Sequence, residues 1–440
     1  MRILVLGSGG REHALAWRLS RDPDVTGLVV APGNPGMARL GRPVPVDLAA
    51  PEDLLALAER ERADLTVVGP EAPLERGVAD LFRARGRPIV GPSQAAAALE
   101  CSKAYAKSFM QRHAIPTARF QIARTVDEAR RAVEAFGCPV VVKADGLAGG
   151  KGVTVAVDRD EADAAIRAAM LDRQFGGAGA ALVIEECLTG PEVSFFVLTD
   201  GREISVLSTA QDHKRIWDGD RGPNTGGMGA FAPSPLMTPE MIADVLGRIA
   251  RPTVAGMAGE GHPYQGFLYI GLMLTADGPK VIEFNVRLGD PEAQVVLPLV
   301  EGPLAVTLME AATGRLGNRR LIESGDRLTG VVLAARHYPA QPETGCEITG
   351  LDAAEAVDGA LVFHAGTREI DGRLVTAGGR VLTVVGRAAS HESATAIAYE
   401  AVSRIRFAGM QYRRDIGQKA LAARGGPAAF ATEALRRASP

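Results

Sequence analysis

The chain has 440 residues, of which 46% are hydrophobic and 5% aromatic, a composition typical of a globular protein that can build apolar cores. At about 150 residues per domain, this length predicts two to four domains. The 49 basic and 52 acidic residues give a formal net charge of −3, so the composition implies no broad basic surface for nucleic acid.

The sequence carries no signal for secretion or for the membrane. Met1 leads directly into Arg-Ile-Leu-Val-Leu without the two regions of a signal peptide, and no apolar run approaches the ~20 residues of a membrane span. The four cysteines lack the spacing of a zinc site or of a disulfide framework. We therefore expect a soluble cytoplasmic protein that has no membrane partner.

A short apolar strand after Met1 leads into a glycine-rich turn, Gly7-Ser-Gly-Gly-Arg-Glu-His13, and then a helix. The turn resembles a dinucleotide-binding loop, but Glu12 stands where the third glycine belongs. No acid follows the second strand, near residues 28–30, to hold a ribose hydroxyl, so the pattern disfavours NAD. The amides of Gly9 and Gly10 at a helix N-terminus still suit one phosphate monoester; a turn without a ligand is the alternative.

The third predicted strand, residues 64–68, ends in the loop Gly69-Pro-Glu-Ala-Pro73. Ligands of open α/β sheets bind outside the carboxyl ends of the strands, which makes Glu71 a candidate substrate contact. A plain turn carboxylate is an equal alternative. The helix predicted over 51–62 and the strand over 88–90 complete a first α/β unit.

A second α/β pattern follows, and its first helix carries two lysines. Ser102 caps a helix that carries Lys103 and Lys107. After a helix over residues 126–136, Lys143 lies inside a strand of valines, where a buried ammonium is costly unless an anion meets it.

The segment Asp145-Gly-Leu-Ala-Gly-Gly-Lys-Gly-Val153 follows this strand at once. Such a loop can cover phosphates with its backbone N–H groups and with the charge of Lys151. It is not a Walker A loop, because it precedes a strand and lacks Lys-Ser/Thr. A glycine-rich hairpin without a ligand is the alternative. The loop residues that we expect to contact a nucleotide are Gly149, Gly150, Lys151 and Gly152.

The strand predicted over residues 181–188 becomes acidic at its end, and Gly190-Pro-Glu-Val193 starts another. Extended backbone can read an adenine edge, and the carboxylate of Glu192 can accept two ribose hydroxyls. Together with Lys143 and the glycine loop, these features predict a nucleotide cleft between two sheets.

Residues 208–230 form a long, polar, glycine-rich stretch that we expect to be a loop, either functional or disordered. Hairpins with turns at Asp200-Gly201 and Asp277-Gly278 flank it. We expect His213 to have a structural or substrate-contacting role rather than that of a catalytic base. The other residues of this stretch with recognition chemistry are Asp212, Lys214, Arg215 and Asn224.

Residues 281–287 alternate apolar and polar side chains, so Glu283, Asn285 and Arg287 are predicted on one face of a strand. A carboxylate beside an amide oxygen suits Mg²⁺, which usually takes few protein ligands. Arg287 could clamp a carboxylate or a phosphate. The turn Leu288-Gly-Asp-Pro-Glu292 adds two more carboxylates. The alternative is a polar sheet face with surface charges.

The last third of the chain predicts short antiparallel strands over residues 328–336, 346–351, 360–365, 374–377 and 380–385, and a helix over 391–405. These elements indicate a small α+β domain that covers the cleft.

Several motifs together resemble the phosphoribosylamine–glycine ligase (glycinamide ribonucleotide synthetase) family, ATP-grasp enzymes of purine biosynthesis. The motifs are Gly7–Leu15, Val68–Leu74, Lys143–Gly152, Gln211–Arg215, Gly222–Gly229 and Arg287–Glu292. The resemblance extends from residue 2 to about residue 420.

The resemblance implies an α/β multidomain fold. It has a Rossmann-like, biotin-carboxylase-type parallel sheet in residues 1–100. An ATP-grasp domain of two α+β subdomains follows in 101–322, with the smaller lid subdomain at about 120–190. A small α+β domain occupies 323–424, and 425–440 form a tail.

It also implies that ATP, glycine and 5-phosphoribosylamine give glycinamide ribonucleotide, ADP and phosphate through a glycyl phosphate, with Mg²⁺ or Mn²⁺ as cofactor. We expect a monomer with a transient contact to the preceding pathway enzyme. The implied catalytic residues are Lys143, Asp212, Arg287 and Asp290. The implied ATP-binding residues are Lys103, Lys143, Gly149, Gly150, Lys151, Gly152, Glu185, Glu186, Leu188 and Glu192. The implied substrate-binding residues are Gly9, Gly10, Glu71, Asp212, Lys214, Asn224 and Arg287, and the implied metal ligands are Glu283 and Asn285.

Two rivals use the same nucleotide cleft. A bicarbonate-activating ATP-grasp carboxylase differs only in its acceptor motifs, here 211–215 and 222–229. A nucleotide-binding regulatory module without turnover is disfavoured because Lys143, Glu283, Asn285 and Arg287 occur together. An oxidoreductase reading depends on the first glycine turn alone and fails at Glu12.

Overall fold

The computed structural model of the chain describes residues 1–147 and 152–422. Three residues expected in the phosphate loop, Gly149, Gly150 and Lys151, lie outside this range, and so does the expected tail over 425–440. In the described part, no helix combines the length and the apolar character needed to span a bilayer.

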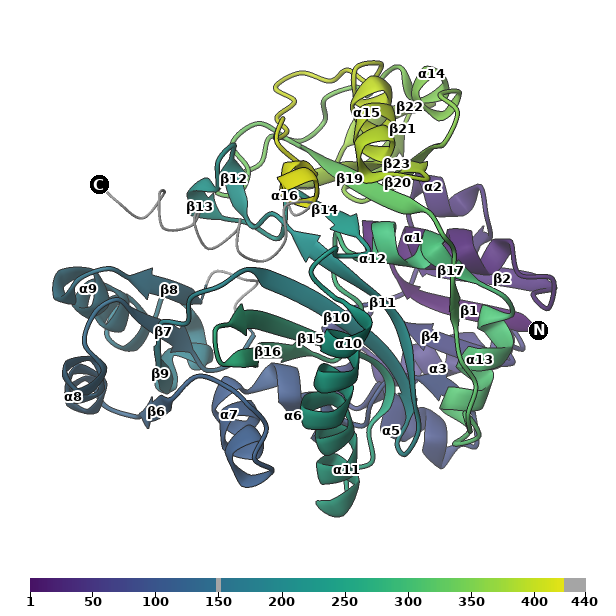
Figure 1. Cartoon of the computed structure of the whole chain (residues 1–440). Coiled ribbons are helices and arrows are strands. Elements are labelled where there is room, and N and C mark those ends of the chain that lie inside the picture. The colour runs from purple at the N-terminus through teal and green to yellow at the C-terminus, as the bar shows by residue number, and fades with distance from the viewer. Residues whose placement is uncertain (148–151, 423–440) are drawn as a thin grey trace.

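Residues 1–101 form a parallel sheet with helices around it (Figure 1). Its strands in sheet order are β3 (Arg42–Pro43), β2 (Gly27–Pro32), β1 (Arg2–Gly7), β4 (Leu65–Val68) and β5 (Ile89–Val90). Its helices are α1 (Gly10–Ser20), α2 (Pro35–Ala38), α3 (Pro51–Arg60), α4 (Glu71–Glu75), α5 (Val78–Ala84) and α6 (Gln94–Cys101). Strand β1 is buried and apolar from Ile3 to Leu6, and β4 is fully buried and apolar except for Thr66, as expected for strands that are covered on both faces. The strands predicted here are confirmed.

A second, antiparallel sheet of four strands projects from one side of the molecule (Figure 1). Its strands in order are β6 (Phe120–Ala123), β9 (Leu182–Glu186), β7 (Val140–Ala144) and β8 (Val153–Ala156), and its helices are α8 (Val126–Phe136) and α9 (Arg159–Met170). Helix α8 begins after Thr125, whose side chain accepts a hydrogen bond from the amide of Glu128. The unit has its own apolar core, which includes Val133, Val140 and Leu182.

The largest sheet has eight strands, and every paired strand in it is antiparallel. In order they are β16 (Gly278–Asn285), β15 (Gln265–Thr275), β10 (Glu192–Asp200), β11 (Ile204–Asp212), β14 (Gly229–Ala232), β19 (Arg327–Ala334), β23 (Arg380–Ala388) and β20 (Ala360–His364). Strand β14 pairs with β11 on one side and with β19 on the other. The strands after residue 327 therefore continue the sheet of the middle of the chain.

The remaining elements connect and cover these sheets. The helices are α7 (Lys103–Arg112), α10 (Pro239–Val245), α11 (Arg251–Gly259), α12 (Ala293–Val296), α13 (Leu304–Ala312), α14 (Leu351–Glu355), α15 (His391–Val402) and α16 (Gln418–Ala422). The strand pairs are β12 (Arg215–Trp217) with β13 (Arg221–Asn224), β17 (Val300–Glu301) with β18 (Ile322–Glu323), and β21 (Thr367–Ile370) with β22 (Arg373–Thr376).

The parallel sheet and the eight-stranded sheet share their apolar cores. One core joins Leu4 and Phe82 to Phe195, and another joins Leu15 to Phe196. This shared packing fixes the carboxyl ends of the parallel strands against the eight-stranded sheet, and the charged site lies near that junction.

The prediction of one long loop over residues 208–230 is wrong. The stretch contains the end of β11, the hairpin of β12 and β13, and β14. Asp220 in the hairpin turn pairs with the guanidinium of Arg413 at 2.8 Å, and Arg413 also donates to the carbonyl of Arg215. Arg413 is almost fully buried, so this tertiary contact orders a segment whose local sequence looks irregular.

The strand predicted over 281–287 is also corrected, because β16 ends at Asn285 and Arg287 lies beyond it. The pairing with β15 shifts register between Glu283 and Val281, so Ile282 is the extra residue of a β-bulge. Residues 346–351 contain only isolated bridges at Glu347 and Thr349 instead of the expected strand.

Candidate active site

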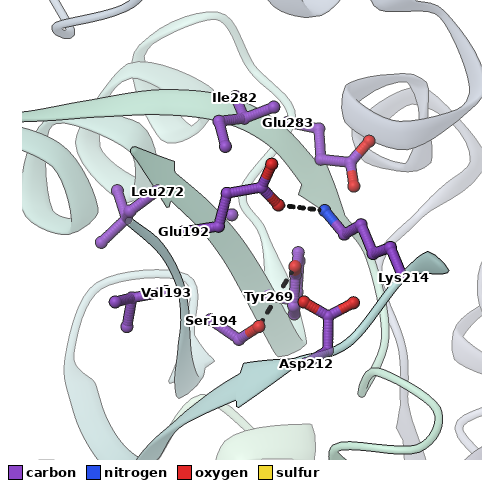
Figure 2. Close-up of a pocket in the computed structure, with 10 residues that line it drawn as sticks. Glu192, Val193, Ser194, Asp212, Lys214, Tyr269, Leu272, Ile282 and Glu283 are labelled. Carbon is purple, nitrogen blue, oxygen red and sulfur yellow. Dashed lines mark hydrogen bonds and ion pairs between the residues drawn. The ribbon is translucent and has the colours of Figure 1, made fainter. Parts of the chain in front are cut away.

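Four neighbouring strands of the eight-stranded sheet line a pocket rich in charged side chains (Figure 2). Glu192 and Ser194 come from β10, Asp212 from β11, Tyr269 from β15 and Glu283 from β16. The antiparallel pairing of these strands brings together residues that are far apart in the sequence. The structure thus gathers four residues that the sequence predicted one by one: Glu192, Asp212, Lys214 and Glu283.

Lys214 opposes the acidic charge of this pocket. Its Nζ lies 2.6 Å from Oε2 of Glu192. Burial lowers the pKa of Lys214, but the charges of Glu192 and Asp212 outweigh burial and raise this pKa above its ordinary value. Burial raises the pKa of Asp212, with Lys214 acting in the opposite direction. Glu192, the predicted ribose contact, and Lys214, a predicted substrate contact, therefore form an ion pair with each other.

Glu292 is a buried carboxyl of this site. From the sequence it was predicted only as a carboxylate of a turn, with no assigned role. Its Oε1 accepts a hydrogen bond of 3.3 Å from Oγ of Ser194, which also lies 3.3 Å from the hydroxyl of Tyr269. Burial, and then the charge of Asp212, raise the pKa of Glu292 to about 7. A Cβ at Gly289 would lie 2.6 Å from the carboxylate, so a larger residue there would displace the Glu292 side chain. Glu292 can therefore exchange a proton near neutral pH.

Two buried lysines share one buried carboxylate. Lys143 from β7 and Lys107 from α7 each lie 3.0 Å from an oxygen of Glu185, and all three side chains are at most 6% exposed. Burial is the main cause that lowers the pKa of Lys107 to about 8. One carboxylate cannot balance two ammonium groups, so the cluster has an excess of positive charge. An anion would compensate it.

Lys103 and the start of the glycine loop lie at the N-terminus of α7. The Nζ of Lys103 donates to the carbonyl of Gly146 at 2.9 Å. The carboxylate of Asp145 accepts hydrogen bonds from the Ser102 hydroxyl and the Ala104 amide, which anchors the loop to the helix. Burial lowers the pKa of Lys103, and Glu283 acts in the opposite direction.

The far end of the loop is anchored to β7. The carbonyl of Gly152 accepts a hydrogen bond from the amide of Ala144 at 2.8 Å. Both described ends of the predicted phosphate loop therefore lie beside the lysine cluster.

Glu283 and Asn285 form the pair that could hold a metal ion. They lie two residues apart at the end of β16, and both are half-buried. Within the described residues, neither side chain makes a hydrogen bond, so their oxygens are available. The described residues contain no group of three or more His, Cys, Asp or Glu side chains that could hold a metal. The donors therefore fit a cation such as Mg²⁺ that takes the rest of its shell from phosphates and water.

Arg287 is held between two carboxylates of the parallel-sheet region. Its Nη2 lies 2.7 Å from Oε1 of Glu100, and its Nε lies 3.1 Å from Oε2 of Glu71. Oε2 of Glu100 also accepts the amide of Val286 at 2.7 Å. Burial raises the pKa of Glu100, although Arg287 opposes this effect. The structure brings together the predicted Arg287 and Glu71, and it adds Glu100, which the sequence presented as an ordinary helix residue.

Asp290 contacts the N-terminus of α1. Its Oδ1 accepts a hydrogen bond of 2.9 Å from Gln294 and lies 3.4 Å from Nη1 of Arg380. Its Oδ2 lies 3.4 Å from the amide of Arg11. Burial raises its pKa, but Arg380 and Arg11 prevail and lower it. Asp290 is therefore ionised, and it joins the N-terminal turn to the C-terminal strands. Gln294 and Arg380 were not predicted as site residues.

The first glycine turn is packed against side chains. Glu12 accepts the Gly9 amide at 2.7 Å, and a Cβ at Gly9 would lie 2.8 Å from the same carboxylate. A Cβ at Gly10 would lie 2.3 Å from Nε2 of Gln294. A Cβ at Gly7, where φ is +127°, would lie 2.4 Å from Glu12. The carboxylate of Glu12 thus fills the turn where a dinucleotide-binding loop needs a glycine.

The predicted adenine contacts Glu185 and Glu186 are the last two residues of β9, and their contact with adenine stays a prediction. Strand β9 lies between β6 and β7, so its backbone is used in pairing on both sides, and the amide of Glu186 donates to the carbonyl of Arg119. Glu186 also forms an ion pair of 2.6 Å with Arg119. Extended backbone outside the sheet begins only after β9, at Cys187 and Leu188.

Two further predicted residues, Asn224 and His213, are neighbours of Asp212 and Lys214 along the chain or across the hairpin of β12 and β13. Asn224 is the last residue of β13, and it is half-buried. His213 is buried, and burial lowers its pKa to about 3, followed by the charges of Lys419 and Arg413. A neutral, buried imidazole fits the structural role expected for His213.

Comparison with known proteins identifies the family. Models of the N, ATP-grasp (A) and C domains of phosphoribosylglycinamide synthetase match residues 1–100, 101–293 and 328–419. The phosphoribosylamine–glycine ligase of Ralstonia nicotianae is 51% identical over 422 residues, which cover 96% of this chain and 100% of that protein. The ligase of Neisseria meningitidis serogroup A is 49% identical, with the same coverage.

Solved structures agree with this result. The crystal structure of the phosphoribosylamine–glycine ligase of Thermotoga maritima has a TM-score of 0.83 and 37% identity, and the match covers 94% of this chain and 100% of that one. The biotin carboxylase domain of the Hydrogenobacter thermophilus 2-oxoglutarate carboxylase shares the fold, with a TM-score of 0.70, 19% identity and coverage of 93% and 91%. The chain belongs to the phosphoribosylamine–glycine ligase family, within the ATP-grasp ligases.

Proposed function

We propose that the chain joins glycine to 5-phosphoribosylamine at the expense of ATP, giving glycinamide ribonucleotide, ADP and phosphate. Its family is one of ATP-grasp ligases of purine biosynthesis, and the relatives that carry the ligase name match nearly the whole chain at about half identity. The single observation that supports nucleotide chemistry most strongly is the excess positive charge of Lys107 and Lys143 around Glu185.

The ATP phosphates would lie where this excess charge meets the glycine loop. Lys143 and Lys103 would contact the phosphates, and the amide of Gly152, with the loop residues Gly149, Gly150 and Lys151, would cover them. Adenine would lie against the backbone after β9 near Leu188, and Glu192 would accept the ribose hydroxyls. The pairing of Lys214 with Glu192 supports this arrangement, because it presents the Glu192 carboxylate ionised.

Glu283 and Asn285 are proposed to hold the divalent cation, Mg²⁺ or Mn²⁺. When bound, such an ion supplies positive charge to the phosphate oxygens. The support is the donor chemistry of the pair and its freedom from hydrogen bonds within the described part of the chain.

Glycine would lie between Arg287, Asp290 and Asp212. Arg287 would face its carboxylate, and Asp212 would face its ammonium. The carboxylate oxygen attacks the γ-phosphorus and the bond to the ADP oxygen breaks, which gives glycyl phosphate. The amine nitrogen of phosphoribosylamine then attacks the carbonyl carbon, the bond to phosphate oxygen breaks, and the nitrogen loses a proton. Both steps need positioning and charge stabilisation more than covalent help from the protein.

The phosphoribosyl group would extend toward the parallel sheet. Glu71, through its ion pair with Arg287, would face the ribose, and the first helix N-terminus near Gly9 and Gly10 would face the phosphate. Lys214 and Asn224 would border the same space. Arg11 and Glu12 pack around this turn, so the phosphate would bind at its outer face.

We further propose the domain division 1–100, 101–322 and 323–424, with a lid at about 120–190. The separate four-stranded sheet and its own core support the lid. The parallel sheet supports the first domain.

An assay of ADP release tests the function. With ATP, Mg²⁺, glycine and freshly made phosphoribosylamine, we expect ADP and glycinamide ribonucleotide in equal amounts, and we expect this product to disappear when any one substrate is omitted. Bicarbonate in place of glycine should not support turnover. ADP release that depends on bicarbonate, or none with the full mixture, would refute the proposal.

A further inference from the structure

The molecule has a second cavity, of about 300 Å³, which shares no lining residue with the pocket of Figure 2. It lies among β11, β18, the start of β19, and the segment that joins β14 to α10. This volume is at the lower end of the range for ligand pockets, so it suits a small molecule rather than a nucleotide.

The hydroxyl groups in this cavity are bonded to protein partners. Ser208 Oγ donates to Oε1 of Glu323 at 2.7 Å. Thr209 Oγ1 accepts the amide of Ser234, and the hydroxyl of Ser234 donates to Oε1 of Gln211 at 3.0 Å. The inner wall is therefore a fixed polar network in which these hydroxyls are already engaged.

Two opposite charges stand at the mouth of the cavity. Arg327 is half-buried, and its Nη1 donates to the carbonyls of Gly325 and Asp326, which holds the guanidinium against its own loop. Within the described residues its Nε and Nη2 make no hydrogen bond. Glu323 is exposed, and Ser208 holds only one of its carboxylate oxygens. Two N–H groups of Arg327 can therefore donate hydrogen bonds to a ligand, and one carboxylate oxygen of Glu323 can accept a hydrogen bond from it.

His391, the first residue of α15, adds an imidazole to the wall, and the other lining residues are apolar. Val206, Met237 and Ile242 line it together with two prolines. A ligand that fills this space must carry an apolar group on one side and opposite charges on the other.

We propose that this cavity binds a small zwitterion with an apolar substituent, the chemistry of a free aliphatic or aromatic α-amino acid larger than glycine. Its carboxylate meets Arg327, because a guanidinium binds a carboxylate through two parallel N–H donors. Its ammonium meets Glu323, and its side chain packs against Met237 and Ile242. This site is additional to the proposed glycine position at Arg287 and does not depend on it.

Isothermal titration calorimetry on the full chain tests the proposal. Leucine, methionine and phenylalanine are titrated in the presence of saturating glycine, so that the proposed glycine position is filled. We expect at least one of them to bind with a stoichiometry of one. Two analogues of leucine, leucinamide without the carboxylate and 4-methylpentanoate without the ammonium, should bind at least about tenfold more weakly.

Variants locate the binding. We expect Arg327→Gln and Glu323→Gln to weaken binding at least about tenfold. Arg368→Gln, which changes an exposed arginine of β21, should leave it unaltered. Melting curves verify that each variant is folded, and the two analogues test the same contacts in the unaltered chain. No binding of any of the three amino acids, binding that glycine competes away, or binding that neither Arg327→Gln nor Glu323→Gln weakens would each overturn the proposal.

Discussion

At the scale of single residues, the site contains two buried clusters in which positive and negative side chains are unequal in number. Glu185 faces both Lys107 and Lys143. Glu292 is buried beside Asp212, and its burial and the charge of Asp212 outweigh the opposing effects of Lys214 and Arg287 on its pKa. Each cluster is left with an imbalance that an ion or a proton can remove. The two imbalances have opposite signs, so they favour opposite ligands: phosphate at the lysines, and a proton or an ammonium at the carboxylates.

Replacing Lys143 by methionine should abolish ATP binding while the fold is retained. The change leaves Lys107 and Glu185 as an even pair, so no buried charge is orphaned, whereas the excess positive charge is lost. We expect the Kd of ATP, measured by calorimetry, to rise at least about 100-fold. Lys280→Met on the neighbouring β16 is the control and should bind ATP normally. Normal affinity in Lys143→Met would exclude the phosphate role.

Replacing Glu292 by glutamine should change how stability depends on pH. The pKa of Glu292 is about 7 in the folded protein, against 4.5 for an ordinary carboxyl. Between these values the folded state holds a proton that the unfolded chain releases. The carboxyl therefore contributes full stability below about pH 4.5 and loses it as the pH rises through about 7. Glutamine has no proton to lose.

The measurement is the melting temperature of Glu292→Gln minus that of the unaltered chain. We expect this difference to be more positive at about pH 8 than at about pH 5, by an amount equivalent to at most about 3 kcal/mol. A difference that does not vary with pH would show that Glu292 titrates normally.

At the scale of elements, most strands and helices could be predicted from local pattern. Helix 126–136 has the predicted bounds, because a capping threonine and apolar spacing agree there. The hairpin of β12 and β13 could not be predicted, because Arg413 orders it from the far end of the chain. The bulge in β16 was missed although the sequence carries a sign of it: Val281 and Ile282 are adjacent apolar residues, which interrupts the alternation of apolar and polar side chains.

Gln211 connects two elements of the site. It is buried on β11, where its Nε2 donates to the carbonyl of Glu192 on β10 and its Oε1 accepts the hydroxyl of Ser234, both at 3.0 Å. Gln211→Leu leaves these buried groups without partners, so we expect a loss of about 1–3 kcal/mol in the free energy of unfolding.

Because Glu192 then loses its backbone support, the KM for ATP should rise about tenfold in Gln211→Leu, equivalent to about 1.4 kcal/mol, with kcat little changed. Steady-state kinetics checks this split. Gln121→Leu, on the exposed side of β6, should leave KM unaltered. An unchanged KM in Gln211→Leu would show that the position of Glu192 does not depend on this bond.

At the scale of the whole molecule, distant segments meet at the site. Lys143 and Glu283 could be predicted, because charged residues inside apolar strands need a partner. Glu100 and Gln294 could not, since their partners come from separate parts of the chain and no local pattern marks them. The sequence also did not predict that one sheet continues from the middle of the chain into its last third, because the paired strands β14 and β19 lie far apart in the sequence.

Arg380 is the main link between the C-terminal strands and the site. Its Nη1 donates to the carbonyls of Gly226 and Asp290, both at 2.5 Å. Arg380→Ala should lower kcat/KM for phosphoribosylamine at least about tenfold, because Asp290 loses its cationic partner and its fixed position. Arg39→Ala is the control: it breaks an exposed ion pair with Glu355 that also joins distant segments, and it should cost at most about 1 kcal/mol in stability and no activity. Equal activities of the two variants would contradict the role of Arg380.

The double pairing of β14 limits how relatives can be recombined. A chimera that exchanges residues 328–419 inserts a foreign β19 beside the native β14, so contacts such as Phe231 opposite Thr329 must be compatible for the splice to fold. A fragment that stops before β19 would present the free hydrogen-bonding edge of β14, and a bare edge of this kind recruits other strands and polymerises. Shuffling experiments should therefore cut inside helices or surface turns and carry β14 together with β19.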